Sequence, residues 1–545
     1  MILVVVVAVI WCPISAKTFS SLNPTSIYTL PIYYVQSQTS NLHIHQGHHD
    51  YNCTRESPCH TIQQALQLII TQFNSSVIGK RSGKIILLGD SFGVDQCNIQ
   101  IPGNCKDERF VHCAAFDEIV LDTELDRGVS LDCDNQRLFK ELEVRNLTIH
   151  NLNLTRIYIG LNRAPAVDRL ILQSVSMYNI QVKDTSEMPI NLDKRVVIVE
   201  SSIVERCTID LIGKSEIQIL QSRVHGTTMH TLQSAISIWN SNLTHFEFLL
   251  QTTSDDLEND MLDIRNSFLC NTTLRLDRFK YISFSYATFS DNTFLQVSNS
   301  DSISCGNVNA IGGHFYWLFR ENNLVTVASS EFSFLNLFDE SWSNKLIDID
   351  SCKQLFIFGC SFENNRGIVL GIEFTNILDL QDLSFENNYG NCIYADMSQR
   401  RGVSQMTLDS VLFRKNKCST DMNGCALSVQ AHEIFIRNIR CIEHSGASNG
   451  GSLYIQAKNT LQIFSSLFLD NLASQLGGAI YIGNSATATF TIENTTCVNN
   501  SAQYAGGCIY YESPQQKEAS ILKDNVFYNN EGKSYGNDIG FHFTI

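Results

Sequence analysis

The chain has 545 residues, a formal net charge of −16 and no basic run, which argues against nucleic acid or an anionic membrane as its main partner, because both require clustered Lys and Arg. Hydrophobic residues make up 43% of the sequence, enough for a sizeable core, and 8 prolines are few for a disordered linker protein. The length allows several ordinary domains or one long repetitive domain.

The first segment, residues 1–16, reads MILVVVVAVIWCPISA and predicts a secretory signal peptide that is cleaved after Ala16. The alternatives are a buried strand and an uncleaved anchor, although the apolar run is too short to span a bilayer comfortably. No later run reaches the ~18 apolar residues of a transmembrane helix. We therefore expect a secreted protein or one on the extracellular cell surface.

Residues 17–50 form a polar N-terminal segment that ends in a histidine-rich stretch, LHIHQGHHD. The side chains of His43, His45, His48, His49 and Asp50 are of the types that bind divalent metals. The stretch precedes the predicted regular structure, and the sequence shows no recognisable hydrogen-bonding partner that would orient the imidazoles. The sequence therefore favours a solvated polar segment over a metal site. We expect no cofactor and no metal.

Residues 51–90 are predicted to form an N-terminal cap and a first coil. Ile62, Leu66 and Ile69 recur at helical spacing, and GKIILLGDSFGV then changes to the alternation of a strand. Cys53 and Cys59 bracket a short segment and are predicted to form a local disulfide. A short amphipathic helix at this place would cover the open end of a stack of strands.

Further along the chain, apolar and polar residues alternate with period two, for example in VVIVESSIV from Val196 and EIQILQS from Glu216. This period indicates strands rather than helices. Asp301 and His314 in this region superficially resemble the catalytic Asp and His of polygalacturonases. Asp301 stands alone where that family has a pair, so a polar corner is the favoured interpretation.

Residues 351–545 contain the clearest repeats. Gly-Gly, a small residue, an aliphatic residue and a tyrosine follow one another from Gly450, Gly477 and Gly506, with fainter copies at Gly390 and Gly536. A second motif, Phe-x-x-Asn, precedes most of these copies and begins at Phe268, Phe289, Phe362, Phe385, Phe413, Phe468 and Phe527. Adjacent copies lie mostly 21 to 30 residues apart. A period of this size indicates stacked supersecondary units.

Each unit is predicted to be strand, corner, strand, corner, because Gly-Gly and Asn supply positive φ at tight turns. Successive units would pair in parallel, which gives an all-β fold, a parallel β-helix over residues 51–545. The aliphatic residues after each Gly pair and the Phe of the second motif are expected to fill the lumen. The Asn amides are expected to hydrogen-bond to one another along the stack.

If the aliphatic residues point inward, Tyr394, Tyr454, Tyr481 and Tyr510 point outward at one place on the coil. They would then form an exposed ladder, with Tyr394 two coils behind Tyr454, and this ladder is the candidate binding face. Exposed tyrosines give a rigid apolar surface with a polar tip, on which sugars stack and proteins dock. The structural alternative, in which the rings lie half-buried at a corner and help the coils stack, is favoured by the regularity of the stack.

Cysteines and sequons agree with export. Removal of Cys12 from the 18 cysteines leaves an odd number, so at least one is expected to be free or joined to another chain. Cys352 with Cys360, and Cys418 with Cys425, are further local pairs suggested by spacing. No C-x-x-C occurs, which disfavours zinc. Candidate N-glycosylation sequons, which Asn-rich loops also produce by chance, begin at Asn52, Asn74, Asn146, Asn153, Asn242, Asn271, Asn494 and Asn499.

Phe468 to Asn471 followed by Gly477 to Ile480 resembles the repeats of chlamydial polymorphic outer membrane proteins and their protist relatives. PCHTIQQAL, from Pro58, is similar to the start of the β-helix in that group. The likeness covers residues 351–545 and 52–89 and is weak between them. It implies a right-handed, pectin-lyase-like β-helix at a cell surface or outside the cell, often adhesive.

Two classes of function remain. One is a non-enzymatic secreted or cell-surface rod, an adhesin that binds a glycan or a surface protein. The other is a divergent polysaccharide lyase or hydrolase, which would need two or three carboxylates on one face of neighbouring coils. No such cluster is readable in the sequence, and GKSYG, from Gly532, fits a turn rather than a nucleophile elbow. We therefore predict no catalytic residue and no transmembrane segment beyond the signal peptide.

Overall fold

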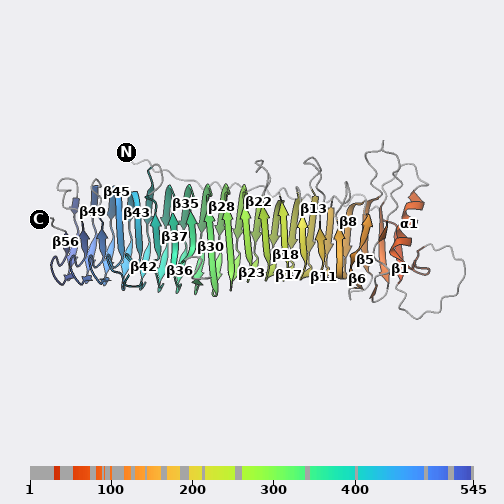
Figure 1. The fold of residues 1–545 in the computed structure, drawn as a ribbon, viewed down its shortest axis with the longest axis horizontal. Helices are drawn as coiled ribbons and strands as arrows, with labels where there is room; N and C mark the ends of the chain where they lie inside the picture. Colours follow the sequence, from red (N-terminus) through yellow and green to blue (C-terminus); the bar gives the residue numbers. More distant parts are fainter. Residues whose placement is uncertain are drawn as a thin grey trace.

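The computed structural model describes residues 30–36, 53–73, 82–88, 91–92, 99–100, 116–123, 129–141, 144–160, 169–183, 195–211, 215–232, 234–251, 261–337, 344–398, 403–483, 489–512 and 521–541. These residues form an elongated rod, a parallel β-helix, in which every named strand pairs in parallel with the strand of the next coil (Figure 1). The predicted parallel β-helix is confirmed. The signal peptide, the histidine-rich stretch, Cys12, Asn52 and Asn74 lie outside the described residues.

Three ladders of strands run along the rod. The first ladder consists of β1 (Ile32–Gln36), β2 (Ser82–Leu88), β5 (Phe116–Thr123), β8 (Val144–His150), β10 (Arg169–Gln173), β13 (Arg195–Glu200), β16 (Ser215–Leu220), β19 (Ser234–Trp239), β22 (Met261–Arg265), β25 (Tyr281–Ser285), β28 (Ser302–Gly306), β31 (Leu324–Ala328), β35 (Gln354–Phe358), β38 (Ile377–Gln381), β41 (Gln405–Asp409), the second halves of β43 (Leu427–Arg437) and β45 (Leu453–Phe464), β49 (Thr489–Glu493) and β53 (Ile521–Lys523).

The second ladder follows the first around each coil. It consists of β3 (Ser91–Phe92), β6 (Val129–Arg137), β9 (Leu152–Gly160), β11 (Ser176–Tyr178), β14 (Ile203–Glu205), β17 (Arg223–His225), β20 (Asn242–Thr244), β23 (Phe268–Cys270), β26 (Thr288–Ser290), β29 (Asn309–Ile311), β32 (Glu331–Ser333), β36 (Ser361–Glu363), β39 (Ser384–Glu386), β42 (Leu412–Arg414), β44 (Arg440–Ile442), β46 (Leu467–Leu469), β50 (Thr496–Val498) and β54 (Val526–Tyr528).

The third ladder closes the coil and begins with the ends of β6 and β9. It continues with β12 (Gln181–Lys183), β15 (Thr208–Leu211), β18 (Thr228–Leu232), β21 (Glu247–Gln251), β24 (Thr273–Asp277), β27 (Thr293–Ser298), β30 (His314–Arg320), β34 (Lys345–Asp350), β37 (Ile368–Glu373), β40 (Ile393–Asp396), the first halves of β43 and β45, β48 (Ile480–Ile482), β52 (Ile509–Tyr511) and β56 (Ile539–Phe541). The remaining strands are short and lie at corners: β4 (Ile99–Gln100), β7 (Phe139–Glu141), β33 (Asn336–Leu337), β47 (Leu472–Ala473), β51 (Ser501–Ala502) and β55 (Glu531–Gly532).

The first coil begins earlier in the chain than predicted. β1 pairs with β2, and its side chains Tyr33 and Val35 are buried. The expectation that residues 17–50 form a polar segment ahead of the coils is therefore wrong at Ile32–Gln36, because IYYVQ alternates in the same way as the later strands. Helix α1 (Ile62–Phe73) lies at the N-terminal end of the rod (Figure 1), with Leu66 and Ile69 buried.

The lumen is filled as the repeat predicts. The rings of Phe332, Phe362, Phe385 and Phe413 stack on successive coils, with centroids 4.6–5.0 Å apart. Phe268 is an exception: it is 37% exposed, and its neighbour Leu269 points into the lumen instead. The apparent Phe-x-x-Asn copy at Phe268 is therefore out of register by one residue, and a shift of one residue reverses the face of every side chain in a strand.

A buried asparagine ladder lines the corner after the second ladder. The side chain of Asn388 shows the pattern: Oδ1 accepts from Asn365 N at 3.0 Å, and Nδ2 donates to Phe362 O at 3.0 Å. The same position is filled on later coils by Asn416, Asn471, Asn500 and Asn530. The positive φ of this corner belongs to the preceding residue, for example Asn387 (φ 54). The ladder asparagine therefore stabilises the turn by hydrogen bonding rather than by adopting its strained conformation.

The Gly-Gly corners also differ in detail from the prediction. In each pair the first glycine has positive φ: Gly450 (59), Gly477 (64) and Gly506 (66). Gly478 does not, but a Cβ on it would overlap Gly507 O and lie 2.7 Å from Ser501 C in the next coil. The second glycine is thus required by the close approach of two backbones.

Candidate functional site

The outward positions of the third ladder form a polar face from β30 to β52, which we call the acidic–aromatic face. Inward residues such as Ile349, Ile372 and Ala395 are buried, whereas the outward residues Asp350, Glu373 and Asp396 beside them are half-buried. The strand register places the outward residues of successive coils in columns. One column is Asp348, Gly371, Tyr394, Ser428, Tyr454, Tyr481 and Tyr510. The neighbouring column contains Arg320, Asp350, Glu373, Asp396, Gln430 and Gln456.

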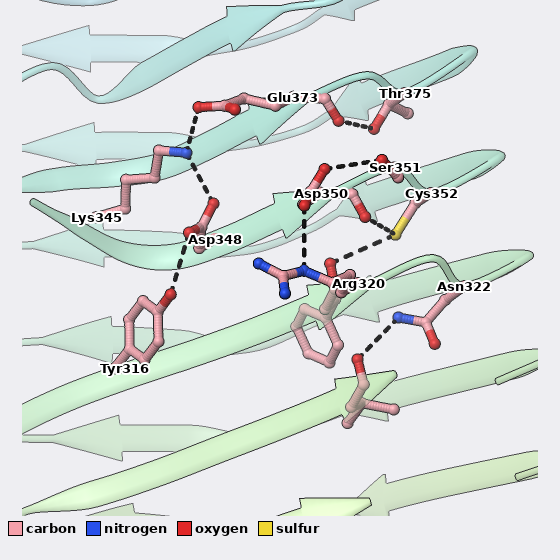
Figure 2. A network of polar contacts seen from close by, with 12 residues as sticks. Tyr316, Arg320, Asn322, Lys345, Asp348, Asp350, Ser351, Cys352, Glu373 and Thr375 are labelled. Carbon is pink, nitrogen blue, oxygen red and sulfur yellow. Dashed lines mark hydrogen bonds and ion pairs between the residues drawn. The ribbon is translucent and has the colours of Figure 1, made fainter. Parts of the chain in front are cut away.

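Lys345 joins two coils of this face. Its Nζ donates to Asp348 Oδ1 at 2.8 Å and to Glu373 Oε1 at 2.6 Å, as Figure 2 shows. Its aliphatic chain crosses Gly371, where any Cβ would collide with it. Burial disfavours the ammonium, but the hydrogen bonds and charges of Asp348 and Glu373 outweigh burial and raise the pKa of Lys345 above its usual value.

The other carboxylates of the face are also engaged. Tyr316 donates its hydroxyl to Asp348 Oδ2 at 3.1 Å (Figure 2). Arg320 pairs with Asp350 at 3.2 Å, and Ser351 Oγ donates to the same carboxylate at 2.8 Å (Figure 2). Ser398 Oγ donates to Asp396 Oδ1 at 2.7 Å. The result is a network of hydrogen bonds and ion pairs that ties neighbouring coils together on their outer surface.

Asp350, Glu373 and Asp396 occupy the same position on three successive coils. The sequence prediction that neighbouring coils carry no carboxylate cluster is therefore wrong. The signal was present: the three residues are 23 positions apart, and each directly follows an apolar residue that points inward. It was missed because outward positions show no hydrophobic periodicity, so only the strand register brings them together.

The tyrosine ladder exists, but it is less exposed than predicted. The rings of Tyr454 and Tyr481 stack at 5.0 Å, and those of Tyr481 and Tyr510 at 5.7 Å. These rings lie outside the lumen, as predicted, in a separate cluster with Ala505 and Leu476.

The four tyrosines of the predicted binding face differ in solvent exposure. Tyr481 is 4% exposed and Tyr510 is 3% exposed, so the expectation of four exposed rings is wrong for these two residues. Their neighbours Leu476 and Ala505 belong to the Gly-Gly corners of adjacent coils, whose path the repeat motif does not reveal. Tyr394 and Tyr454 are half-buried and keep an accessible edge. Burial and the charges of Asp396 and Glu373 raise the pKa of Tyr394, which keeps its hydroxyl protonated at neutral pH.

Asp301 and His314 do not form a catalytic pair in the structure. Asp301 Oδ1 accepts from Asn323 Nδ2 at 2.6 Å at a corner before β28. His314 begins β30 in a different ladder, and its Nδ1 lies 2.5 Å from Leu337 O. Gly536 has φ +64 at a corner, in keeping with a turn at GKSYG. Within the described ranges no three His, Cys, Asp or Glu side chains are placed to hold a metal ion.

Three disulfides lie wholly within the described residues: Cys53–Cys59, Cys418–Cys425 and Cys497–Cys508. The suggested pairing of Cys352 with Cys360 is wrong, because both side chains are buried and neither sulfur is joined in a disulfide. Strand β35 lies between them, and five extended residues at ~3.3 Å each separate the two Cα atoms by more than the ~7 Å that a disulfide spans.

The sequons within the described residues differ in accessibility. Asn242, Asn494 and Asn499 are exposed, whereas Asn146, Asn153 and Asn271 are half-buried. Asn271 Oδ1 accepts from Asn292 at 2.8 Å, and Asn499 Oδ1 accepts from Asn529 at 2.8 Å. Glycosylation modifies the amide nitrogen, so the exposed amides of Asn242, Asn494 and Asn499 are the most accessible acceptors for a glycan. In the part of the chain described here, no helix combines the length and the apolarity needed to cross a membrane.

Comparisons with known proteins leave the family open. No family model matches the chain. A transmembrane domain-containing protein of Dictyostelium discoideum is 34% identical over 79 residues, which are 14% of this chain and 5% of that protein's length. Tailspike protein 3 of bacteriophage CBA120 aligns with 81% of this chain and 60% of its own, at 9% identity and a TM-score of 0.32. A double mutant of the tailspike protein of the Escherichia coli bacteriophage HK620, in complex with a pentasaccharide, covers 88% and 78% at 11% identity and a TM-score of 0.19.

Proposed function

We propose that the chain is a non-enzymatic, secreted or cell-surface rod that binds a glycan or a surface protein through the acidic–aromatic face. The observation that carries the proposal is the position of Tyr394 and Tyr454, two half-buried rings in one column, beside Glu373, Asp396 and Gln456 in the next. Half-buried tyrosines present a flat apolar edge and a hydroxyl at low entropic cost, and fixed carboxylates and amides beside them accept and donate hydrogen bonds. Both features suit sugar rings and polar protein surfaces.

A glycan-array screen of the secreted chain tests this proposal. We expect bound glycans whose signal falls at least about tenfold when Tyr394 and Tyr454 are both replaced by Ala, because stacking contacts of about 1 kcal/mol each are lost. Tyr286→Ala is the matched control, since this ring is 62% exposed at the corner between β25 and β26. An unchanged signal in the double variant, or an equal loss in the control, would contradict a role for this face.

A second candidate is a polysaccharide lyase or hydrolase, and the column of Asp350, Glu373 and Asp396 favours it. Acid and base groups on neighbouring coils are what such chemistry requires. We rank it second because Lys345 and Arg320 already engage Glu373 and Asp350, which restricts their approach to a substrate. Release of oligosaccharides from a polysaccharide by the native chain, lost in Glu373→Gln, would reverse this ranking.

The export route, the right-handed sense of the coil, the cap role of α1 and the kinship with polymorphic outer membrane proteins belong to the same proposal. The described disulfides support an oxidising compartment. N-terminal sequencing of the protein from its native cell is expected to begin after Ala16. A mature chain that begins at Met1 would contradict export by signal cleavage.

A further inference from the structure

A groove with a volume of about 1160 Å³ lies at the corner between the second and third ladders. Its lining includes Phe334, Asn364, Arg366, Asn387 and Tyr389. These residues come from three successive coils, so the groove runs along the axis of the rod. No motif in the sequence marks it, because its lining is assembled from separate coils that only the stacking brings together.

Glycines form part of the groove floor. Gly367 has φ +110 and Gly390 has φ +123, and a Cβ on Gly390 would overlap Gly367 O. The backbone amides of this floor are already paired: Gly367 N donates to Tyr389 O at 2.8 Å, and Gly390 N donates to Lys417 O at 2.7 Å. An extended peptide therefore finds no free strand edge here, and recognition in the groove must come from side chains.

The side chains of the groove combine exposed aromatic rings with polar groups that could contact a polar, ring-shaped ligand. The rings of Phe334 and Tyr389 are 59% and 56% exposed. Within the described residues, the amides of Asn364 and Asn387 and the guanidinium of Arg366 have no hydrogen-bond or ion-pair partner. Exposed rings beside unused amide donors and acceptors match the apolar faces and hydroxyl edges of sugars.

The charge at the groove specifies the ligand further. A column of bridges along this corner joins Arg366 to Tyr389 and Tyr389 to Lys417 on consecutive coils. Lys417 is exposed and, like Arg366, has no acidic partner among the described residues, although the chain as a whole has a net charge of −16. Nearby cations of the rod, such as Arg414 and Arg437, do have such partners. Two unpaired cations on either side of an exposed tyrosine favour an anionic ligand.

We propose that this groove binds an acidic oligosaccharide, with a carboxylate or sulfate on Arg366 and a sugar ring against Tyr389. The guanidinium offers a planar pair of donors to either anion, and Lys417 adds a second positive charge two coils away, ~10 Å along the axis. The proposal deepens the proposed function by adding a ligand class at a second site. The two sites share no residue, so their failures are distinguishable.

Calorimetric titration of the full chain tests the inference with three hexasaccharides: oligogalacturonate, chondroitin sulfate and neutral cellohexaose. We expect one of the two acidic probes to bind with an affinity that falls as salt rises, and cellohexaose to bind at least tenfold more weakly. The acidic probe that binds identifies the anion as carboxylate or sulfate. Absence of binding by both acidic probes, or equal binding of the neutral one, would overturn the proposal.

Variants assign the binding to the groove. Arg366→Gln and Tyr389→Ala are each expected to weaken the acidic probe at least tenfold without a change in melting temperature, because both side chains are exposed. Arg440→Gln and Tyr286→Ala, which replace exposed residues outside the groove, are expected to bind as the parent chain does. If only the Tyr394 and Tyr454 double variant loses binding, the groove is not the binding site of the acidic probe, and the acidic–aromatic face is.

Discussion

At the scale of single residues, the asparagine ladder contains one substitution, His444. It is fully buried and takes the place of asparagine between Asn416 and Asn471. Asn416 N donates to its Nδ1 at 3.2 Å, which requires an unprotonated nitrogen. Burial lowers the pKa of His444 to about 4, against hydrogen bonds that raise it. The neutral imidazole is therefore part of the fold.

This position predicts a pH-dependent stability. Because the pKa of His444 is about 4 when folded and ~6.5 when unfolded, the unfolded chain takes up the proton first as pH falls. The stability is complete above about pH 6.5, is lost between there and about pH 4, and amounts to about 3 kcal/mol. Urea unfolding at several pH values measures the free energy of unfolding as a function of pH. In the window between about pH 4 and 6.5, this free energy should change less steeply with pH for His444→Asn than for the parent chain. An identical slope in both proteins would contradict the assignment.

At the scale of elements, the Gly-Gly corner predicts different costs for its two glycines. Gly477→Ala strains a residue with φ +64, at a cost of about 1–2 kcal/mol. Gly478→Ala places a Cβ against the backbone of the next coil, which cannot move aside as a side chain can. We therefore expect a larger loss for Gly478→Ala, about 3 kcal/mol or more, in the free energy of unfolding. Gly306→Ala is the control, because no atom lies within 4 Å of the Cβ that this change adds. Equal midpoints of denaturant unfolding for all three variants would rule out this account.

The tyrosine ladder gives a second prediction for an element. Since Tyr481 is 4% exposed and stacked between two rings, Tyr481→Ser is expected to destabilise the corner by about 2–4 kcal/mol. Tyr394→Ser, a half-buried ring opposite Ser428, is expected to cost less than half as much. Thermal melting of the two variants checks this order, and the reverse order would show that Tyr481 is exposed in solution.

The same elements show which features of the structure can be predicted from the sequence. Alternation with period two and a spacing of 21 to 30 residues suffice for a parallel β-helix, because only stacked coils bury the apolar half of such short strands. The strand register is harder to predict. One residue more or less in a corner moves every side chain of the next strand to the opposite face, as at Phe268. The outer surface is harder still: Asp350, Glu373 and Asp396 meet only once the register is known, and the burial of Tyr481 depends on a neighbouring corner.

At the scale of the whole molecule, the rod is a one-dimensional stack in which each coil touches only its neighbours. The stability of such a stack is a sum of local terms, so a defect at one end leaves the distant coils folded. α1 contacts the first strands, β1 and β2, and the side chain of Ile69 fills the space beside Gly83. We therefore expect the helix to stabilise the first coils directly and the remaining coils only through them.

Leu66→Asp tests this local coupling. Leu66 is 2% exposed, so a buried carboxylate there should release α1 from the first coils at a cost of several kcal/mol. Hydrogen exchange is expected to show lost protection in β1 and β2, with protection retained in β36 and β39. Gln67→Asp adds the same charge at an exposed neighbouring position and should leave all four strands protected. Protection lost along the whole rod would show global cooperativity, and protection kept in β1 would show that α1 does not stabilise the end of the stack.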